Sequence, residues 1–562
     1  MGKVLVVGLD GASLDLIRPW AAQGKLPTFA RLLSEGASGP LRSTVHPYTA
    51  QAWTTMVTGV NAGRHRLFDF WERDLESYGF HLTNAGARAA PAIWSVLSER
   101  GRRVVVVNVP MTFPPEGVNG VLVSGRDTPG LSSEYAHPAS VKEELEKALA
   151  RPYVIVPNDW RWMRLGRPDK AREALLQEAE VRFAATRHLM ETREWDFCMF
   201  VVGATDGAAH FFWRLHDPEF PGHDPELAET LGDVLLEVYQ QVDQLLADLL
   251  QAAGDEVSLM IVSDHGSGSS QLRAIHLNRW LAQHGWLHFE EADSEPRTGR
   301  WMVNLVACLK QVAYSLIPYQ QLNRLRQLWP DRWRKRLSRL ELFAGVDWSR
   351  TQAFSEERRG SIWINLAGRE PEGIVPQADY EALRDEIAQA LERASVPWSD
   401  EPLVRRVWRR EELFAGPYTD RIPDLLIELK SPSQFHVHKG AHHGPAVRPL
   451  TEREIAEMTV TGDHRMEGTL ILHGAGVQPG ATFDPVDMRD VLPTALYLMG
   501  EAIPAYAEGR LVEAAFEDAW LAARPPVYDD TDLDGPGTER YDYSSEETDL
   551  LEERLEGLGY LG

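Results

Sequence analysis

Carboxylate and imidazole side chains follow three separate apolar runs in the first half of the chain. Such residues are the usual ligands of Zn²⁺ and other divalent transition metals. One Asp after a strand is often only a helix cap and one His is often structural, but three such places together favour a metal site. Their number exceeds what one tetrahedral ion needs, so we expect two ions. The residues are Asp10 after Val4–Leu9, Asp206 and His210 after Phe197–Val202, and Asp264 and His265 after Leu259–Val262.

A hydroxyl that could act as a nucleophile lies in the segment Thr44–Gly59. Thr49 follows Pro47 in this segment and precedes a helix-like stretch. It could simply cap that helix. A helix N-terminus also presents N–H groups and a positive potential to a phosphate. The segment alone leaves both roles open, and capping is the simpler one.

The patterns around these candidates predict the elements that position them. The apolar runs are short and β-branched, and Val104–Val109 is a fourth of the same kind. Runs that are apolar at nearly every position are typical of strands covered on both faces. Helix-like stretches such as Ala171–Thr192 and Pro225–Ala253 separate them. The alternation predicts an α/β fold with a large, doubly wound, mostly parallel sheet flanked by helices, with functional side chains beyond the carboxyl ends of its strands.

The composition is that of a globular protein with an acidic balance. The 562 residues include 83 acidic and 58 basic side chains, which give a formal net charge of −25, and 43% of them are hydrophobic. These values exclude a chain that is disordered or fibrous as a whole. The charge argues against nucleic acid as a specific partner, although a local metal ion would still allow a phosphorylated substrate.

The cysteine content and the N-terminus indicate the compartment. Cys198 and Cys308 cannot build a disulfide framework, and Cys198 lies in an apolar run that favours burial. The N-terminal residues lack the features of a signal peptide, and no stretch approaches the ~18 apolar residues of a membrane span. We therefore expect a soluble, cytoplasmic protein.

Shifts in composition divide the chain into four parts. The core patterns occupy 1–290 and 346–524, separated by an inserted helical subdomain or lid at 291–345 and followed by an acidic tail at 525–562. Within 301–340 there are eight basic residues and one acidic residue, with Trp interleaved. This stretch could be a solvated helix face, or a surface for peripheral contact with membrane lipids or for an anionic substrate.

The tail is also turn-rich. The run Asp530–Gly535 is similar to the opening of a calcium-binding loop, but Tyr541 stands where the loop needs its final acidic ligand. The run therefore reads as a solvated linker.

Several of these segments together resemble a known family. Their order and spacing are similar to those of the type I phosphodiesterase/nucleotide pyrophosphatase family in the alkaline phosphatase superfamily, and two further motifs resemble a microbial subgroup of it. The resemblance implies an alkaline-phosphatase-like fold. The segments are Asp10, the Thr49 segment ending in Thr58-Gly59, Asp206 with His210, Asp264-His265-Gly266, Asp347–Phe354, Ile362–Val375 and Gly462–Gly500, and the subgroup motifs are Asn61–His65 with Phe68–Phe70 and His210–Trp213.

The resemblance implies a site with two divalent metal ions. Zinc is the expected metal, with manganese or iron as alternatives that suit the same ligands. Thr49 would be both a metal ligand and the nucleophile. One ion would be held by Asp10, Thr49, Asp264 and His265, and the other by Asp206, His210 and His464.

The last of these ligands is a choice between two histidines. We prefer His464 because the strand-like run Thr469–Leu472 follows it, as in the family's pattern. His443, in a pair of adjacent histidines, is the alternative. Weaker candidates for contact with the substrate are Asn61, Arg64 and His65.

The resemblance implies hydrolysis of a small phosphorylated substrate through a phosphothreonine on Thr49. Sulfatases of the superfamily need Cys or Ser at this position, so sulfate esters are not expected. Alkaline phosphatases follow the nucleophile with an arginine that binds a doubly charged monoester, and Gln51 and Trp53 do not supply it. This favours a phosphodiester or pyrophosphate bond, although Arg64 or Arg126 could substitute for the missing arginine.

Two alternatives stay open. The chain could be a phosphomonoesterase or a phosphomutase of the same superfamily. It could also be a non-catalytic protein that keeps the scaffold and its metals for binding. The complete set of candidate ligands argues against the second alternative, because a decayed site should have lost at least one.

Overall fold

The computed structural model describes residues 2–290, 343, 345–356, 360–430, 436–437, 444–531, 533 and 541–558. The predicted insertion at 291–345, with the stretch 301–340, lies almost entirely outside the described residues, as does His443. The structure therefore tests neither the membrane contact nor the alternative ligand, and the division of the chain into four parts stays a prediction.

A nine-stranded mixed sheet organises the larger part of the molecule, as predicted. Its five central strands run parallel, and the strands on either side of them run antiparallel to their central neighbours. In spatial order the strands are β20 (Val486–Asp487), β2 (Ala37–Arg42), β19 (Glu467–His473), β9 (Val257–Val262), β1 (Lys3–Leu9), β8 (Phe197–Val202), β5 (Val104–Val107), β6 (Gly120–Val123) and β7 (Ala136–His137).

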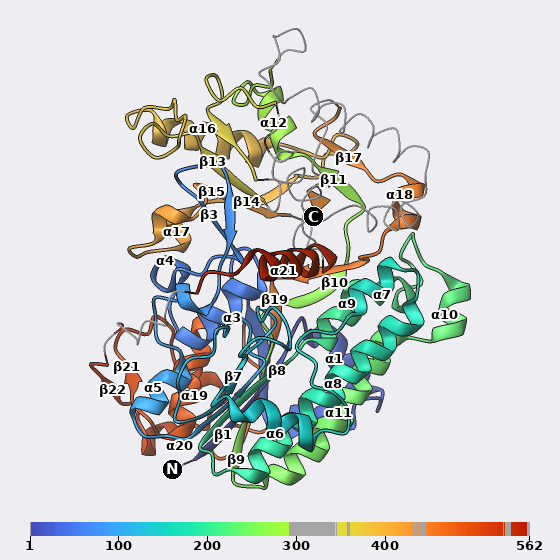
Figure 1. Ribbon diagram of the computed structural model, residues 1–562, viewed down its shortest axis with the longest axis vertical. Helices are drawn as coiled ribbons and strands as arrows, with labels where there is room; N and C mark the ends of the chain where they lie inside the picture. The colour runs from blue at the N-terminus through green and yellow to red at the C-terminus, as the bar shows by residue number, and fades with distance from the viewer. Residues whose placement is uncertain are drawn as a thin grey trace.

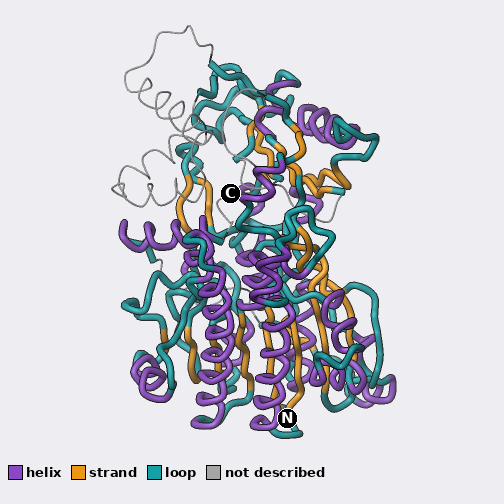
Figure 2. The backbone as a smooth tube through the Cα atoms, turned by 90° about the vertical axis from the view of Figure 1, so that its right-hand side faces the viewer, coloured by secondary structure: helices purple, strands orange, loops and turns teal. Residues whose placement is uncertain are grey.

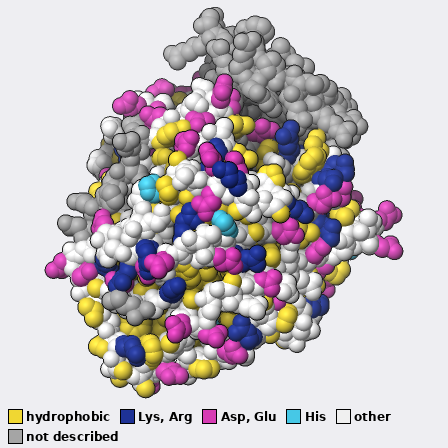
Figure 3. Space-filling view, turned by 60° about the horizontal axis from the view of Figure 1, so that its bottom comes forward, with side chains coloured by type: hydrophobic (Ala, Val, Ile, Leu, Met, Phe, Trp, Pro, Cys, Tyr) yellow, Lys and Arg dark blue, Asp and Glu magenta, His cyan; other side chains and the backbone are white. Residues whose placement is uncertain are grey.

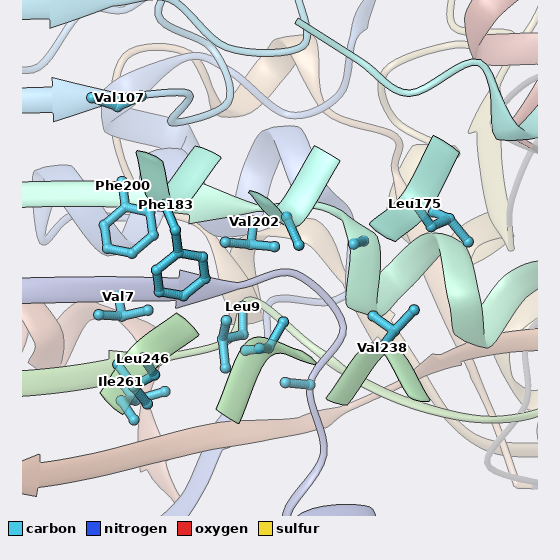
Figure 4. Packing of buried hydrophobic residues seen from close by; sticks show 14 of the residues in the cluster. Val7, Leu9, Val107, Leu175, Phe183, Phe200, Val202, Val238, Leu246 and Ile261 are labelled. Carbon is cyan, nitrogen blue, oxygen red and sulfur yellow. The ribbon is translucent and has the colours of Figure 1, made fainter. Parts of the chain in front are cut away.

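Helices cover both faces of this sheet because alternate residues of each strand point to opposite sides. In β1, Leu5 and Val7 belong to one buried cluster and Val4 and Val6 to the other. Figure 4 shows part of the first cluster, where Phe183 and Leu246 from the helices lie near strand residues. The helices of the first face are α1 (Leu14–Ala22), α2 (Pro27–Glu35), α6 (Ser140–Ala148), α7 (Asp159–Arg164), α8 (Pro168–Thr192), α9 (Ala204–His216) and α11 (Val234–Ala253), and those of the second are α3 (Thr49–Thr58), α5 (Ile93–Glu99) and α19 (Val491–Met499) (Figure 1).

Most predicted elements are confirmed, and one helix is divided. The predicted helix Pro225–Ala253 consists of α10 (Pro225–Leu231) and α11, because Gly232 adopts a φ of 73° that ends the first helix. Asp233 then caps the second helix by accepting a hydrogen bond from the Leu236 N–H. Cys198 is buried in β8, as expected.

A smaller lobe lies beyond the carboxyl ends of the central strands (Figures 1 and 2). It is built on a four-stranded antiparallel sheet and has its own hydrophobic cluster. Its elements are β12 (Ala353–Phe354), β13 (Ser361–Ile364), β15 (Leu425–Leu429), β14 (Val404–Arg409), α12 (Leu277–Gln283), α16 (Tyr380–Arg393) and α17 (Arg410–Leu413).

Short elements join the two lobes and complete the chain. The pair β10 (Gly266–Ser269) and β18 (Gly462–Arg465) is the most important for the site. The others are β3 (Trp71–Arg73), β4 (Phe80–Leu82), β11 (Arg273–Ile275), β16 (His436–Val437), β17 (Val447–Pro449), β21 (Ile503–Pro504), β22 (Tyr528–Asp529), α4 (Ala62–His65), α18 (Glu452–Glu457), α20 (Asp518–Ala523) and α21 (Ser545–Gly557).

Part of the predicted acidic tail packs on the core. Ser544 caps α21 through a capping box with Glu547. Leu551, Leu555 and Leu558 of this segment are buried. Residues 541–558 are therefore a structural part of the core, whereas the run Asp530–Gly535, which we expect to be a linker, is only partly among the described residues.

The surface carries charges of both signs. On the face shown in Figure 3, acidic and basic side chains are interspersed. Among the helices that the structure describes, none is both long enough and apolar enough to cross a bilayer.

Candidate metal centre

Three aspartates meet at the carboxyl edge of the central strands. β1 pairs in parallel with β8 and β9, with Leu9 opposite Val202 and Gly8 opposite Val262. This register places the residues that follow the three strands at one edge of the sheet. Asp10, Asp206 and Asp264 follow these strands and are at most 2% exposed.

Three histidines join the aspartates. His210 lies one helical turn after Asp206 on α9, so that its Nε2 lies 3.2 Å from Asp206 Oδ1. His464 arrives from far along the chain because β18 pairs with β10, which begins directly after His265. The rings of His265 and His464 stack with their centroids 3.5 Å apart. All three imidazoles are buried.

Five of the six side chains form two overlapping groups with metal-ligand spacing. In one group, Asp206, His210 and His464 each offer an atom within 4.8 Å of the others. The second group contains Asp10, Asp206 and His265. Asp264 borders it, with Oδ2 lying 3.4 Å from His265 Nε2. Asp206 thus belongs to both groups.

Backbone carbonyls fix the orientation of every imidazole. The Nδ1 atoms of His210, His265 and His464 lie 3.0, 3.0 and 2.8 Å from the carbonyl oxygens of Gly462, Gly266 and Pro47. A carbonyl only accepts, so each Nδ1 carries the proton and each Nε2 presents its lone pair to the centre. Metal-bound histidines commonly show this arrangement.

The centre is electrostatically unbalanced in a way that a cation would relieve. Burial, and then the neighbouring Asp10 and Asp206, raise the pKa of Asp264 well above its ordinary value. Burial alone would lower the pKa of His210, but the Asp206 carboxylate outweighs it and raises that pKa to about 9. The Nε2 atoms of His210 and His464 lie 3.0 Å apart. Two lone pairs at this distance repel each other unless a proton or a metal ion lies between them.

Buried polar atoms at the centre support the same interpretation. Asp10 Oδ1, Asp206 Oδ1, Asp264 Oδ2 and His265 Nε2 have no hydrogen-bond partner among the residues that the structure describes. Buried polar atoms are normally hydrogen-bonded or bound to a metal. The donor set of three carboxylates and three imidazoles therefore fits divalent transition metals.

Thr49 lies beside this centre. It is fully buried at the first residue of α3, two residues after Pro47, whose carbonyl accepts the proton of His464 Nδ1. One turn later, Trp53 packs so closely on β1 that a Cβ at Gly8 would lie 2.6 Å from its ring. The N-terminus of α3 is thus held at the same edge of the sheet as Asp10.

Two charged residues near the centre were not among the predicted ligands. Arg126 lies three residues beyond β6, and its Nη2 is 3.0 Å from Asp10 Oδ2. Like the predicted ligands, Arg126 follows the carboxyl end of a parallel strand. The sequence suggested it only as a possible replacement for the arginine of alkaline phosphatases. Asp159 on α7 is buried, has two carboxyl oxygens without a hydrogen-bond partner among the described residues, and has a pKa that burial raises to about 7. No sequence pattern indicated Asp159.

The three weaker candidates have partners within the protein. Asn61 caps α4 through the Gly63 N–H and binds Glu508. Arg64 also pairs with Glu508. His65 is buried, with Nε2 2.9 Å from Thr55 Oγ1, and burial followed by Arg88 lowers its pKa to about 3. Their contact with the substrate stays a prediction that these bonds do not support.

Known proteins resemble this chain in sequence and in fold. The sequence profile described as type I phosphodiesterase/nucleotide pyrophosphatase matches residues 4–454. Solved structures that resemble the chain include human ectonucleotide pyrophosphatase/phosphodiesterase 5 (13% identity, TM-score 0.48, covering 92% of this chain and 100% of that chain). Another is phosphonoacetate hydrolase from Sinorhizobium meliloti 1021 (16% identity, TM-score 0.49, covering 89% of this chain and 96% of that chain). No significant match occurs among curated proteins.

Proposed function

Because the chain belongs to the type I phosphodiesterase/nucleotide pyrophosphatase family, we propose that it hydrolyses phosphodiester or pyrophosphate bonds of small phosphorylated molecules with Thr49 as the nucleophile. Family membership makes the chain a phosphoric ester hydrolase, as the resemblance predicted. The observation that carries the finer proposal is the convergence of six buried ligand-type side chains beside the N-terminus of α3.

The family depends on divalent metal ions, and the donor set of this chain fits two of them. We assign the first ion to Asp10, Thr49, Asp264 and His265 and the second to Asp206, His210 and His464, with zinc preferred over manganese or iron. The presence of Asp206 in both groups supports a pair of neighbouring ions. When bound, such ions lower the pKa of a hydroxyl and neutralise the charge of a phosphoryl group.

The residues of this chain supply the rest of the reaction. Thr49 Oγ attacks phosphorus, and the new O–P bond forms as the bond to the leaving oxygen breaks. The hydroxyl proton ends on the leaving group, and the phosphorus stays on Thr49 with its remaining substituent. The backbone N–H groups of the first turn of α3 stabilise the negative oxygens of the transition state. Water then attacks the same phosphorus, releases the product and restores the Thr49 hydroxyl.

The position of Arg126 favours a second candidate, a phosphomonoesterase. A guanidinium near the centre could bind the additional charge of a monoester. Arg64, the other substitute arginine, pairs with Glu508 instead. The diester remains the leading proposal because Gln51 and Trp53 occupy the turn that carries the arginine in alkaline phosphatases.

The experiment compares bis(p-nitrophenyl) phosphate with p-nitrophenyl phosphate after metal removal and after Zn²⁺ or Mn²⁺ is restored. We expect metal-dependent cleavage of the diester that Thr49→Ala abolishes and Thr49→Ser partly retains. Covalent ³²P on the wild type, absent from Thr49→Ala, would identify the intermediate. Preference for the monoester would favour the second candidate. Activity that persists in Thr49→Ala would refute the proposed nucleophile.

A further inference from the structure

Arg126 is a largely buried cation at the edge of the candidate metal centre. Its side chain is 10% exposed, and its Nη2 lies 3.0 Å from Asp10 Oδ2. The absence of a side chain at Gly203 makes room for it, since a Cβ there would lie 3.0 Å from Arg126 Nη2. Arg126 is thus held beside Asp10, at the edge of the group of ligand-type side chains.

The loop that carries Arg126 is fixed from the core side by the next residue. The Asp127 carboxylate accepts hydrogen bonds from the backbone N–H groups of Met111 and Phe113 at 3.0 and 2.7 Å. Ser124 donates its hydroxyl to the Thr112 carbonyl at 2.7 Å. These bonds tie the loop after β6 to the loop after β5.

The C-terminal segment fixes the same loop from the other side. Arg554 on α21 donates to the carbonyl oxygens of Arg126, Thr128 and Pro129 at 2.8, 2.7 and 2.9 Å. Tyr543 donates its hydroxyl to the Asp127 carbonyl at 3.0 Å. Four residues of the loop therefore each have a carbonyl bound by this segment.

The C-terminal segment is itself firmly held at this position. Tyr543 stacks on Phe113 with the ring planes 10° apart. Gly557 lies so close to α7 that a Cβ there would be 2.2 Å from the Trp160 ring. Figure 1 shows α21 lying across the carboxyl end of the sheet. Burial lowers the pKa of Arg554 to about 10, so its guanidinium is still charged at neutral pH.

A charged guanidinium is costly to bury, and its placement here needs an explanation. Among the residues that the structure describes, the partners of Arg554 are three backbone carbonyls and no carboxylate. Attaching the helix to the core would not by itself require a buried charge. What the three bonds achieve is a fixed backbone at the base of the Arg126 side chain. A planar guanidinium on a fixed backbone can bind two phosphoryl oxygens in one geometry.

We propose that Arg126 binds the non-bridging oxygens of the substrate's phosphoryl group and that Arg554 is the positioning residue that holds the Arg126 loop for this contact. The proposal rests on the proposed function and deepens it. A phosphate monoester has one more charged oxygen than a diester, so the contact strengthens binding of the monoester more than that of the diester. Arg126 is therefore a specificity-determining residue.

The experiment measures kcat/KM for both p-nitrophenyl esters in full-length, metal-loaded variants. Arg126→Met should lower the value for the monoester about 10- to 100-fold and lower the value for the diester less, because a hydrogen bond to a charged group is lost. Arg126→Lys should recover part of the loss. Equal losses on the two esters would overturn the assignment of Arg126.

The role of Arg554 is tested by its dependence on Arg126. Arg554→Met should lower the activity on the monoester by a smaller factor, and Arg554→Lys should restore part of it. In the double variant, Arg554→Met should cause no further loss once Arg126 is already Met, whereas multiplied losses would refute the positioning role. Tyr543→Phe removes one hydrogen bond to the same loop. It should lower kcat/KM for the monoester about 2- to 10-fold, with a smaller loss for the diester. This variant decides the question if Arg554→Met does not fold, and an unchanged ester preference in Tyr543→Phe would then refute the positioning role.

A matched control is Arg100→Met. Arg100 donates to the Ala502 carbonyl at 2.7 Å and pairs with Asp529, but it precedes the amino end of β5, at the opposite edge of the sheet. This variant should lose stability without a change in the ratio of the two esters. A changed ratio in this variant would show that any loss of a buried arginine alters the preference, and would overturn the proposal.

Binding of inorganic phosphate separates this proposal from the proposed function. Isothermal calorimetry on Thr49→Ala should show phosphate binding that the additional change Arg126→Met weakens about 10- to 100-fold. If the wild type cleaves neither ester, the proposed function fails while this measurement still tests Arg126. Unchanged phosphate affinity would overturn the assignment of Arg126 whatever the activity.

Discussion

Replacing Gly462 with alanine should damage the metal centre without touching any ligand. A Cβ at this position would lie 2.1 Å from the carbonyl oxygen of Ala209 on α9. This contact between β18 and α9 also builds the site. The Gly462 carbonyl accepts the proton of His210 Nδ1, and His464 follows two residues later on β18. Gly462→Ala must therefore separate the strand that carries His464 from the helix that carries His210.

The magnitude follows from the size of the clash. Real Cβ atoms essentially never approach another heavy atom within 3.0 Å, so the strand and the helix must separate by roughly 1 Å. Metal–ligand distances tolerate only about 0.2 Å. We expect the ion assigned to Asp206, His210 and His464 to bind about 10- to 100-fold more weakly, the range typical of a disturbed ligand orientation. Overpacking should also lower the free energy of unfolding by about 1–3 kcal/mol.

The assay is a titration of the metal-free protein with Zn²⁺ in competition with a chromophoric chelator. Gly268→Ala is the matched control on the partner strand β10, where the three atoms nearest to the added Cβ all belong to the guanidinium of the flexible Arg465 side chain. We expect this control to keep its affinity for both ions. The reasoning is refuted if Gly462→Ala binds two ions with wild-type affinity, or if the control loses as much affinity as Gly462→Ala.

Three further predictions concern charge and folding. The pKa of His65 is about 3 in the folded protein and 6.5 as the ordinary value, so protonation favours the unfolded chain and the free energy of unfolding falls as pH drops from 6.5 toward 3. The loss should reach about 2 kcal/mol at pH 5. In urea denaturation, His65→Gln should lack this part of the pH dependence. If the unfolding free energies of wild type and variant change equally with pH, the prediction is wrong. Asp264→Asn should raise the Tm of the chelator-treated protein in scanning calorimetry because it removes a crowded buried carboxyl, while it weakens metal binding; a lower Tm would argue against it. Asp243 accepts the backbone N–H groups of Thr28 and Phe29 at 3.1 and 2.8 Å, so Asp243→Asn should cost about 1–3 kcal/mol of unfolding free energy in urea with kcat unchanged. An unchanged urea midpoint would contradict that assignment.

Much of the centre could be predicted because its ligands follow directly from the strand pattern. Buried parallel strands are recognisable as continuous apolar runs, and their carboxyl ends must meet at one edge. Asp10, Asp206 and Asp264 were found in this way. Arg126 was within reach of the same reasoning, since it follows the apolar run of β6. An arginine is not a metal ligand, so Arg126 entered only as a possible substitute for the arginine of alkaline phosphatases and not through the strand pattern.

Other parts of the site depend on contacts that local patterns do not contain. His464 reaches the centre through the pairing of β18 with β10, so its choice over His443 came from the family's pattern and not from spacing. Asp159 lies in a short helix, where a carboxylate is ordinarily a solvated residue. The docking of α21 does not follow from its composition, because a charged composition is typical of a solvated tail. Leu551, Leu555 and Arg554 of the helix, together with the flanking Tyr543 and Leu558, attach the segment to the core.

The position of β19 in the large sheet has a consequence for how the protein is made. β19 lies between β2 and β9 but is synthesised about 200 residues after β9. At roughly 5–20 residues per second, this interval lasts on the order of 10–40 s. During that time β9 has an unpaired edge, and β2 lacks both β19 and β20, its neighbours in the sheet. The nascent chain must therefore carry exposed strand edges throughout this interval, during which they can pair with other chains. A chain that ends at residue 290 would lack β19 and β20 and would leave β2 without either of its neighbours in the sheet.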